Sequence, residues 1–131
     1  MLIKEGAEVA KFGFSDTQWE KAKVEAIQIL SDVARRENTI SYSDLAKRIH
    51  AISIDPHDYA MRTFLGEIST EEHDRNRGML SAVVVYKLGD QMPGPGFFDL
   101  ARDLGNRFRD ETEFWIKELQ RVYKAHKTGK S

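Results

Sequence analysis

The chain contains no cysteine among its 131 residues. That absence excludes disulfides, thiolate metal sites and cysteine nucleophiles together, and it is compatible with a reducing compartment. No apolar run in the sequence approaches the roughly 20 residues that a membrane-spanning helix needs. The first residues also show no basic region followed by an apolar segment, as a secretory signal would. We therefore expect a cytoplasmic protein with no membrane partner.

An excess of charge of either sign is also missing. Lys and Arg number 20, Asp and Glu number 21, and the formal net charge is -1. A domain that binds DNA mainly through its phosphates is expected to be basic overall or on one face. Any nucleic-acid interface in this protein must therefore be a local patch.

The composition is that of a folded globular protein, with 40% hydrophobic and 31% charged residues. A chain of this length is predicted to form one domain whose core needs neither metal nor disulfide. We divide the chain into an N-terminal arm over residues 1–14, which lacks helical periodicity, and a single domain over residues 15–131. Phe12 and Phe14 are expected to dock the arm onto that domain.

A long amphipathic helix is predicted near each end of the domain. Ser15 and Gln18 have the spacing of a capping box, and the helix that they begin is expected to end near Asn38. Asp110 is predicted to cap the last helix, whose apolar face includes Trp115. We expect these N- and C-terminal helices to pack together as a buttress for the segment between them.

That segment, residues 39–98, predicts two short helices followed by a strand pair. Ser43 is expected to cap the first helix, and Asp55-Pro56 is a start signal for the second. Residues 80–86 are apolar and β-branched, and residues 92–98 would form an irregular return strand. The predicted fold is α+β and mainly helical: a winged helix-turn-helix with a small β-hairpin.

The run Ile40-Ser41-Tyr42-Ser43-Asp44-Leu45-Ala46-Lys47-Arg48-Ile49 resembles the opening of a known DNA-binding domain. It is the C-terminal domain of O6-alkylguanine-DNA alkyltransferases and alkyltransferase-like proteins. Leu65-Gly66 is similar to the valine-glycine pair of that family's second helix, which places the family's arginine on Thr63, one residue from Arg62. The resemblance covers about half of the chain. It implies a winged helix with nucleic-acid contacts through Tyr42 and Arg62.

The same resemblance places residues 80–85 where the family carries its reactive cysteine. Ser81 stands at the cysteine position, and Ala82 and Val83 stand where the family has histidine and arginine. A serine without a neighbouring base is not activated as a nucleophile. We therefore expect no alkyl transfer, and what the resemblance implies is architecture.

A helix-turn-helix presents the N-terminal residues of its second helix to base edges. On this interpretation, the residues predicted to contact nucleic acid are Tyr42, Arg48, Arg62, Thr63 and Lys87. The second helix and the segment after it are nevertheless acidic, with Glu67, Glu71 and Glu72 among others, and phosphates would be repelled there. Protein contact through the same scaffold therefore stays open as an alternative.

The most unusual local sequence predicts a second candidate surface. Glycine allows a backbone or ligand to approach closely, and aromatic rings can stack on a base or a side chain. The same residues could instead form a rigid connector whose phenylalanines close the core. The possible interaction loop consists of Pro93, Gly94, Pro95, Gly96, Phe97 and Phe98.

No catalytic, cofactor or metal site is predicted. The acidic run that includes His73 has its residues side by side, so they cannot all face one ion, and no second histidine stands at ligand spacing. The leading hypothesis is a non-enzymatic nucleic-acid-binding module with double-stranded DNA as its partner. The alternative is a protein-interaction or regulatory module that binds a protein partner or forms a homodimer.

Overall fold

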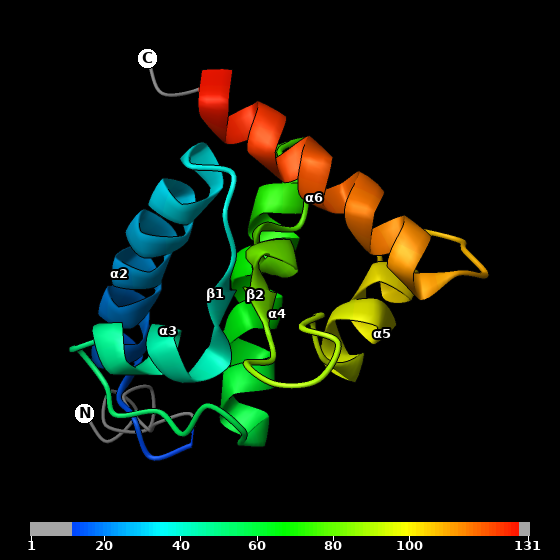
Figure 1. The fold of residues 1–131 in the computed structure, drawn as a ribbon. Coiled ribbons are helices and arrows are strands. Elements are labelled where there is room, and N and C mark those ends of the chain that lie inside the picture. Colours follow the sequence, from blue (N-terminus) through cyan, green and yellow to red (C-terminus); the bar gives the residue numbers. More distant parts are fainter. Residues whose placement is uncertain (1–11, 129–131) are drawn as a thin grey trace.

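A computed structural model describes residues 12–128, and helices dominate this part of the chain (Figure 1). The elements are α2 (Asp16–Arg35), β1 (Ile40–Ser41), α3 (Tyr42–Arg48), α4 (Tyr59–Asp74), the 3-10 helix η1 (Leu80–Val83), β2 (Val84–Val85), α5 (Pro95–Asp103) and α6 (Glu111–Thr128). The prediction of a mainly helical α+β protein is confirmed. Most of the predicted arm, residues 1–11, lies outside the described residues.

Local sequence signals explain how the long helices begin. Ser15 Oγ accepts the Gln18 N–H at 3.1 Å and the Gln18 side chain accepts the Ser15 N–H at 3.3 Å, so the predicted capping box is present. Asp110 Oδ1 likewise accepts the Glu113 N–H at 3.0 Å ahead of α6. Each cap satisfies a backbone donor that the first helical turn would leave unpaired.

The helices α3 and α4 begin at other residues than predicted. Ser41, rather than Ser43, caps α3, because its Oγ accepts the Asp44 N–H at 3.0 Å. The Asp55 carboxylate accepts the His57 N–H at 2.8 Å and forms a turn, so α4 begins later, at Tyr59. The helix then continues through the polar segment that follows Ser69.

The sheet differs from the predicted hairpin. β1 and β2 pair in parallel, with Ile40 opposite Val84, and they form a two-stranded sheet. The predicted return strand is wrong because Gly94 is the N-cap of α5 and Pro95 occupies its first turn. Proline there is pre-organised for a helix and lacks the N–H that a strand would donate. One hairpin-like bond remains, from Tyr86 N–H to the Met92 carbonyl at 3.0 Å.

The core lies where α2, α4, α6 and η1 meet. Figure 1 shows α6 running across the top of the molecule, over the ends of α2 and α4, and it contacts both α2 and η1. The predicted packing of the N- and C-terminal helices is therefore present. Tyr123 Oη donates to the Asn38 carbonyl at 2.8 Å, and Trp115 Nε1 donates to the Ala82 carbonyl at 2.8 Å. No helix between residues 12 and 128 has an apolar stretch long enough to cross a bilayer.

Buried charges join α6 to the end of α4. Glu72 is only 2% exposed, and its carboxylate accepts from Arg77 Nε at 2.9 Å and lies 3.4 Å from His126 Nε2. His126 and Arg77 together outweigh the effect of burial and lower the pKa of Glu72 to about 2. Glu118, also buried, accepts the Met79 N–H at 2.7 Å. These contacts fix α6 against η1 and the residues after α4.

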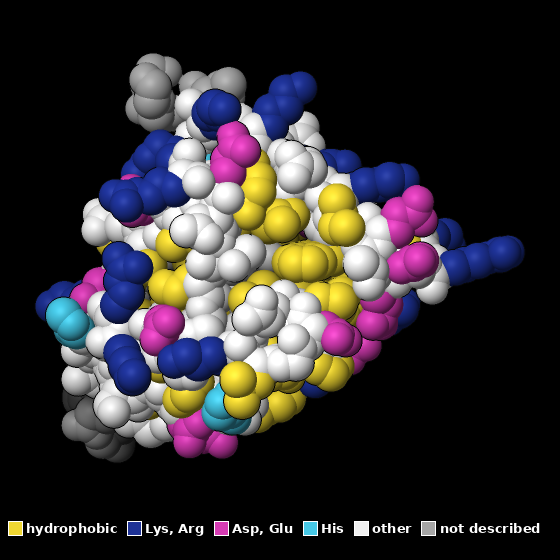
Figure 2. Space-filling view, in the orientation of Figure 1, with side chains coloured by type: hydrophobic (Ala, Val, Ile, Leu, Met, Phe, Trp, Pro, Cys, Tyr) yellow, Lys and Arg dark blue, Asp and Glu magenta, His cyan; other side chains and the backbone are white. Residues whose placement is uncertain are grey.

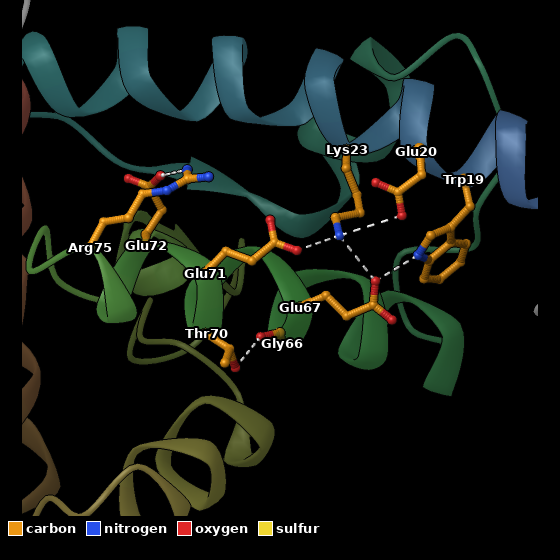
Figure 3. Close-up of polar contacts among 9 residues, drawn as sticks. All are labelled: Trp19, Glu20, Lys23, Gly66, Glu67, Thr70, Glu71, Glu72 and Arg75. Atoms are coloured by element: carbon orange, nitrogen blue, oxygen red, sulfur yellow. Dashed lines mark hydrogen bonds and ion pairs between the residues drawn. The ribbon is translucent and has the colours of Figure 1, made fainter.

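A second buried charge joins α2 to α4 (Figure 3). The ammonium group of Lys23 lies 2.7 Å from Glu71, 3.3 Å from Glu67 and 3.7 Å from Glu20. Burial lowers the pKa of Lys23, but the hydrogen bonds to Glu71 and Glu67 outweigh it, so the pKa is raised above its ordinary value. Trp19 Nε1 donates to Glu67 at 2.8 Å. The acidic face of α4 is thus partly neutralised by the buried ammonium group of Lys23.

Candidate functional site

A pocket of about 320 Å³ opens between the first turns of α4 and the start of α5. Its walls come from segments that are far apart in the sequence: α3, the turn before α4, α4 itself, η1, and the loop that leads into α5. The lining residues are Tyr42, Pro56, His57, Asp58, Tyr59, Met61, Arg62, Leu65, Gly66, Ser81, Tyr86, Gly94, Pro95, Gly96, Phe97 and Leu100.

Gly94, the N-cap of α5, and Gly96, in the first turn of α5, allow this part of the chain to pass close to the pocket side chains. A Cβ on Gly94 would lie 2.6 Å from Tyr86 Oη, and one on Gly96 would lie 2.9 Å from Arg62 Nε. Both distances are shorter than real Cβ contacts. A larger residue at either position would therefore require Tyr86 or Arg62 to move. The Gly94 N–H also donates to Tyr42 Oη at 2.8 Å, which fixes this tyrosine against the loop.

Aromatic rings form one wall of the pocket. The rings of Tyr42 and Tyr86 have centroids 5.2 Å apart and are tilted by 45°. Burial raises the pKa of Tyr42 above its ordinary value, since the phenolate would lose more hydration than the phenol. Tyr42 is therefore a neutral hydroxyl at physiological pH. Tyr86 also lines the pocket and is 40% exposed.

A cation lies at the mouth of the pocket. Arg62 Nη2 donates to Asp99 Oδ2 at 2.8 Å, and its guanidinium lies 5.9 Å from the centre of the Tyr59 ring. Both members of the Arg62–Asp99 pair are about half exposed, so the pair contributes little to stability. Breaking the Arg62–Asp99 pair therefore costs little free energy, so the guanidinium can bind another anion in place of Asp99.

The structure brings together two of the five residues predicted to contact nucleic acid. Tyr42 and Arg62 both line the pocket, whereas Arg48, Thr63 and Lys87 do not. Arg48 is exposed at the end of α3, and Lys87 is exposed with its ammonium 4.0 Å from Asp44. Tyr42 and Arg62 therefore form a pocket group, Arg48 and Lys87 are separate surface positions, and Thr63 is half-buried outside the pocket.

The predicted interaction loop is divided between the surface and the core. Gly94, Pro95, Gly96 and Phe97 line the pocket. Phe97 and Phe98 are nevertheless only 5% and 3% exposed, and their rings pack edge to face at 5.1 Å. Pro93 and Phe98 line a neighbouring groove together with Leu88. The alternative that the phenylalanines close the core is the one that their burial supports.

Ten of the sixteen lining residues are not among the predicted site residues, and three of these ten carry a hydroxyl: Tyr59, Tyr86 and Ser81. Tyr86 was assigned only to a strand. For Ser81 the only indication in the sequence is the family resemblance, which places it at the position of the reactive cysteine. Ser81 is buried, and its Oγ lies 2.6 Å from the Oγ of Ser69. Ser69 had no signal at all, because nothing in the local sequence indicates which buried hydroxyls will meet.

No group of three or more His, Cys, Asp or Glu residues between residues 12 and 128 has an arrangement that could hold a metal ion. The polar groups that line the pocket are hydroxyls, the Arg62 guanidinium, the His57 imidazole and the Asp58 carboxylate, and they stand beside aromatic faces. No family model, no curated protein and no solved structure matches the chain.

Proposed function

We propose that this protein is a non-enzymatic nucleic-acid-binding module that binds DNA through the pocket and the surface around it. One observation carries the proposal: Tyr42 and Arg62, both expected as contacts from the sequence, line one pocket with the glycine-proline loop. In this proposal α3 and α4 are the helix pair of a winged helix-turn-helix. The loop after β2 takes the place of the wing, although it is not a hairpin.

The pocket has properties that suit one unstacked base. Its volume of about 320 Å³ is at the lower end of the range for small-ligand sites, roughly 300–1,000 Å³. Tyr42 and Tyr86 offer aromatic faces, and base–aromatic stacking contributes about 1–3 kcal/mol per base. Taking a paired base out of a duplex costs a few kcal/mol. DNA with an unpaired base should therefore bind more tightly than a fully paired duplex.

Phosphates would be contacted outside the pocket. Figure 2 shows Lys and Arg side chains over α2 and α3, and Asp and Glu side chains nearer the start of α6. Lys47, Arg48 and Lys87 are exposed. Three phosphate contacts would give a slope of log affinity against log salt of about −2 to −3. This moderate slope fits a protein whose net charge is -1.

The experiment measures binding of fluorescent DNA with one unpaired base, by anisotropy, at several salt concentrations. Arg62→Ala is expected to weaken binding about tenfold, the effect of losing one charge-assisted hydrogen bond. Arg102→Ala is the matched control, because Arg102 also lies near Asp99, at 3.8 Å, but does not line the pocket. Absence of binding at low salt, or equal losses in both variants, would exclude the proposal.

Protein interaction remains a second candidate, and one observation favours it. Leu88 is 82% exposed and lies on a groove of about 460 Å³ beside Met92 and Pro93. A homodimer or protein partner that covers this groove would bury Leu88. Sedimentation at increasing concentration would then show association that Leu88→Ser abolishes. Phe98→Ala is unsuitable for this test, because Phe98 belongs to the core.

A further inference from the structure

The turn after β2 presents a leucine to solvent beside an apolar groove. Leu88 is 82% exposed, and it lines the groove of about 460 Å³ between this turn, α5 and the first residue of α6. Pro93 and Phe98, which also line the groove, are buried, so its deeper part is apolar and fixed by the core. Met92 is half-buried, and its sulfur accepts from Thr112 Oγ1 at 3.5 Å. A methionine in this position can adapt its shape to an apolar side chain.

The conformation of this turn holds the leucine away from the core. Gly89 and Gln91 both have positive φ, +78° and +54°, and the second is an uncommon conformation for a residue with a side chain. Gln91 Nε2 donates to the Lys87 carbonyl at 3.2 Å and closes the turn. Leu88 is not part of the hydrophobic core cluster. A single exposed leucine is ordinary on a protein surface, but one that adjoins an apolar groove forms a contiguous patch with it.

The charge on the groove is of one sign. Asp90 and Glu111 are the two charged residues that line it, and both are exposed. Asp90 forms no ion pair with any residue between 12 and 128, and Glu111 lies 3.7 Å from Arg102, beyond hydrogen-bond distance. The dipole of α6 is sufficient to explain Glu111 in its first turn, but Asp90 lies in a turn outside any helix. Figure 2 shows hydrophobic side chains gathered between β2 and α6, with Asp and Glu side chains near the start of α6.

These charges decide which partner fits the groove. Phosphates of DNA and anionic lipid headgroups would be repelled by the two carboxylates. A second copy that used the same groove would place Asp90 and Glu111 against their own equivalents, because a twofold interface joins one patch to itself. Like charges brought together in this way oppose association. A protein segment with Lys or Arg beside a large apolar side chain complements both the charge and the apolar lining.

We propose that this groove docks a basic segment of another protein. The segment buries a large apolar side chain against Leu88 and Met92, and its Lys or Arg residues lie beside Asp90 and Glu111. The proposal rests on protein interaction, the second candidate function, and it does not depend on DNA binding. Tyr86 lines both this groove and the pocket, so the partner would lie next to the proposed DNA site.

The test selects binders from a library of random short peptides displayed on phage, with the full chain as the target. Retained peptides are expected to carry Lys or Arg on both sides of a large apolar residue. One of them is then synthesised with a fluorescent label, and its affinity is measured by anisotropy at several salt concentrations. Because the two carboxylates are exposed, the affinity should fall as salt rises. A selection that retains no peptide, or peptides without this enrichment, would overturn the inference.

Two variants, each with a matched control, place the peptide in the groove. Leu88→Ser should weaken its binding roughly tenfold to 100-fold, the effect of leaving one leucine side chain unburied. Val24→Ser changes a side chain that is 59% exposed on α2, outside the groove, and should bind like the wild type. Asp90→Asn should weaken binding about two- to fivefold and reduce its salt dependence. Asp103→Asn, at an exposed acid outside the groove, should do neither, and equal losses in variant and control would overturn the inference.

Two further measurements separate this inference from the proposed functions. Leu88→Ser and Asp90→Asn are expected to bind bulged DNA, a duplex with one unpaired base, as tightly as the wild type. Peptide binding without binding of any DNA would support the inference and exclude the proposed DNA-binding function. Self-association in sedimentation that Leu88→Ser abolishes would assign the groove to a second copy, overturning the inference while protein interaction stands. Absence of both peptide binding and self-association would exclude the second candidate function as well.

Discussion

The absence of a side chain at Gly94 leaves room for Tyr86 and Tyr42 in the pocket wall. Gly94 has a backbone conformation that any residue can adopt, with φ −76°, so its restriction comes from its neighbours and not from strain. A Cβ there would lie 2.6 Å from Tyr86 Oη and 3.4 Å from Tyr42 Oη. Because Tyr86 is 40% exposed, it can move outward and leave the core unchanged.

We therefore expect Gly94→Ala to weaken binding of bulged DNA several-fold while the melting temperature changes little. Anisotropy and thermal unfolding measure the two effects. Tyr86→Phe in the Gly94→Ala background removes the hydroxyl oxygen nearest to the new methyl group and should recover part of the binding. No recovery, or a large loss of stability in Gly94→Ala, would show that the glycine is needed for folding instead.

At this scale a local pattern or a family resemblance can point to single residues, and their role stays a prediction. Tyr42 and Arg62, predicted in this way, line the pocket, whereas Arg48, Thr63 and Lys87 do not. Ser69 could not be found, since its importance depends on meeting Ser81 across two elements. A buried polar pair has no signature in the local sequence of either partner.

The end of α4 shows how an element is held by a buried carboxylate. The pKa of Glu72 is lowered from its ordinary 4.5 to about 2 by His126 and Arg77. A lowered pKa contributes stability above the unfolded pKa, and this contribution is lost as pH falls through the folded pKa. The shift corresponds to roughly 3 kcal/mol.

Glu72→Gln is expected to reduce the free energy of unfolding by roughly 3 kcal/mol at pH 7. It should also flatten the decrease in stability between pH 5.5 and pH 2. Urea unfolding at several pH values measures both effects. Asp74→Asn is the control, because Asp74 is the exposed last residue of the same helix. Equal pH dependence in wild type and Glu72→Gln would contradict this account.

Local signals predicted the starts of the two long helices, but not those of α3 and α4. The Ser15 capping box and the Asp110 cap needed only neighbouring residues, and both are present. The hairpin was wrong because Val84 and Val85 have the apolar, β-branched character of a strand whatever their partner is. They pair with β1, which is separated from them along the sequence by α3 and α4. A local pattern contains no information about so distant a partner.

Residues 12–128 share one hydrophobic core, to which elements from both ends of this range contribute. Trp19 in α2 is 1% exposed, and Trp115 in α6 is partly buried with its Nε1 bonded to η1. The two tryptophans therefore report on opposite ends of the same packed unit. If that unit is cooperative, both should report one transition.

We expect the single-tryptophan variants Trp19→Phe and Trp115→Phe each to unfold in one transition, with fluorescence and circular dichroism giving the same midpoint. Each variant should lose about 1–3 kcal/mol, because its tryptophan donates a hydrogen bond and fills core volume. Two separated midpoints within one variant would show that α6 detaches before the rest of the molecule unfolds.

The parallel pairing of β1 with β2 has a consequence for the speed of folding. A hairpin can close within microseconds, because its two strands adjoin. Here the chain must first bring together strands that are separated by all of α3 and α4. Closing a loop of this length costs roughly 3 kcal/mol of chain entropy before any sheet contact offsets it. The smallest element of the fold is therefore expected to form late, and the protein to fold more slowly than a helical bundle of equal length.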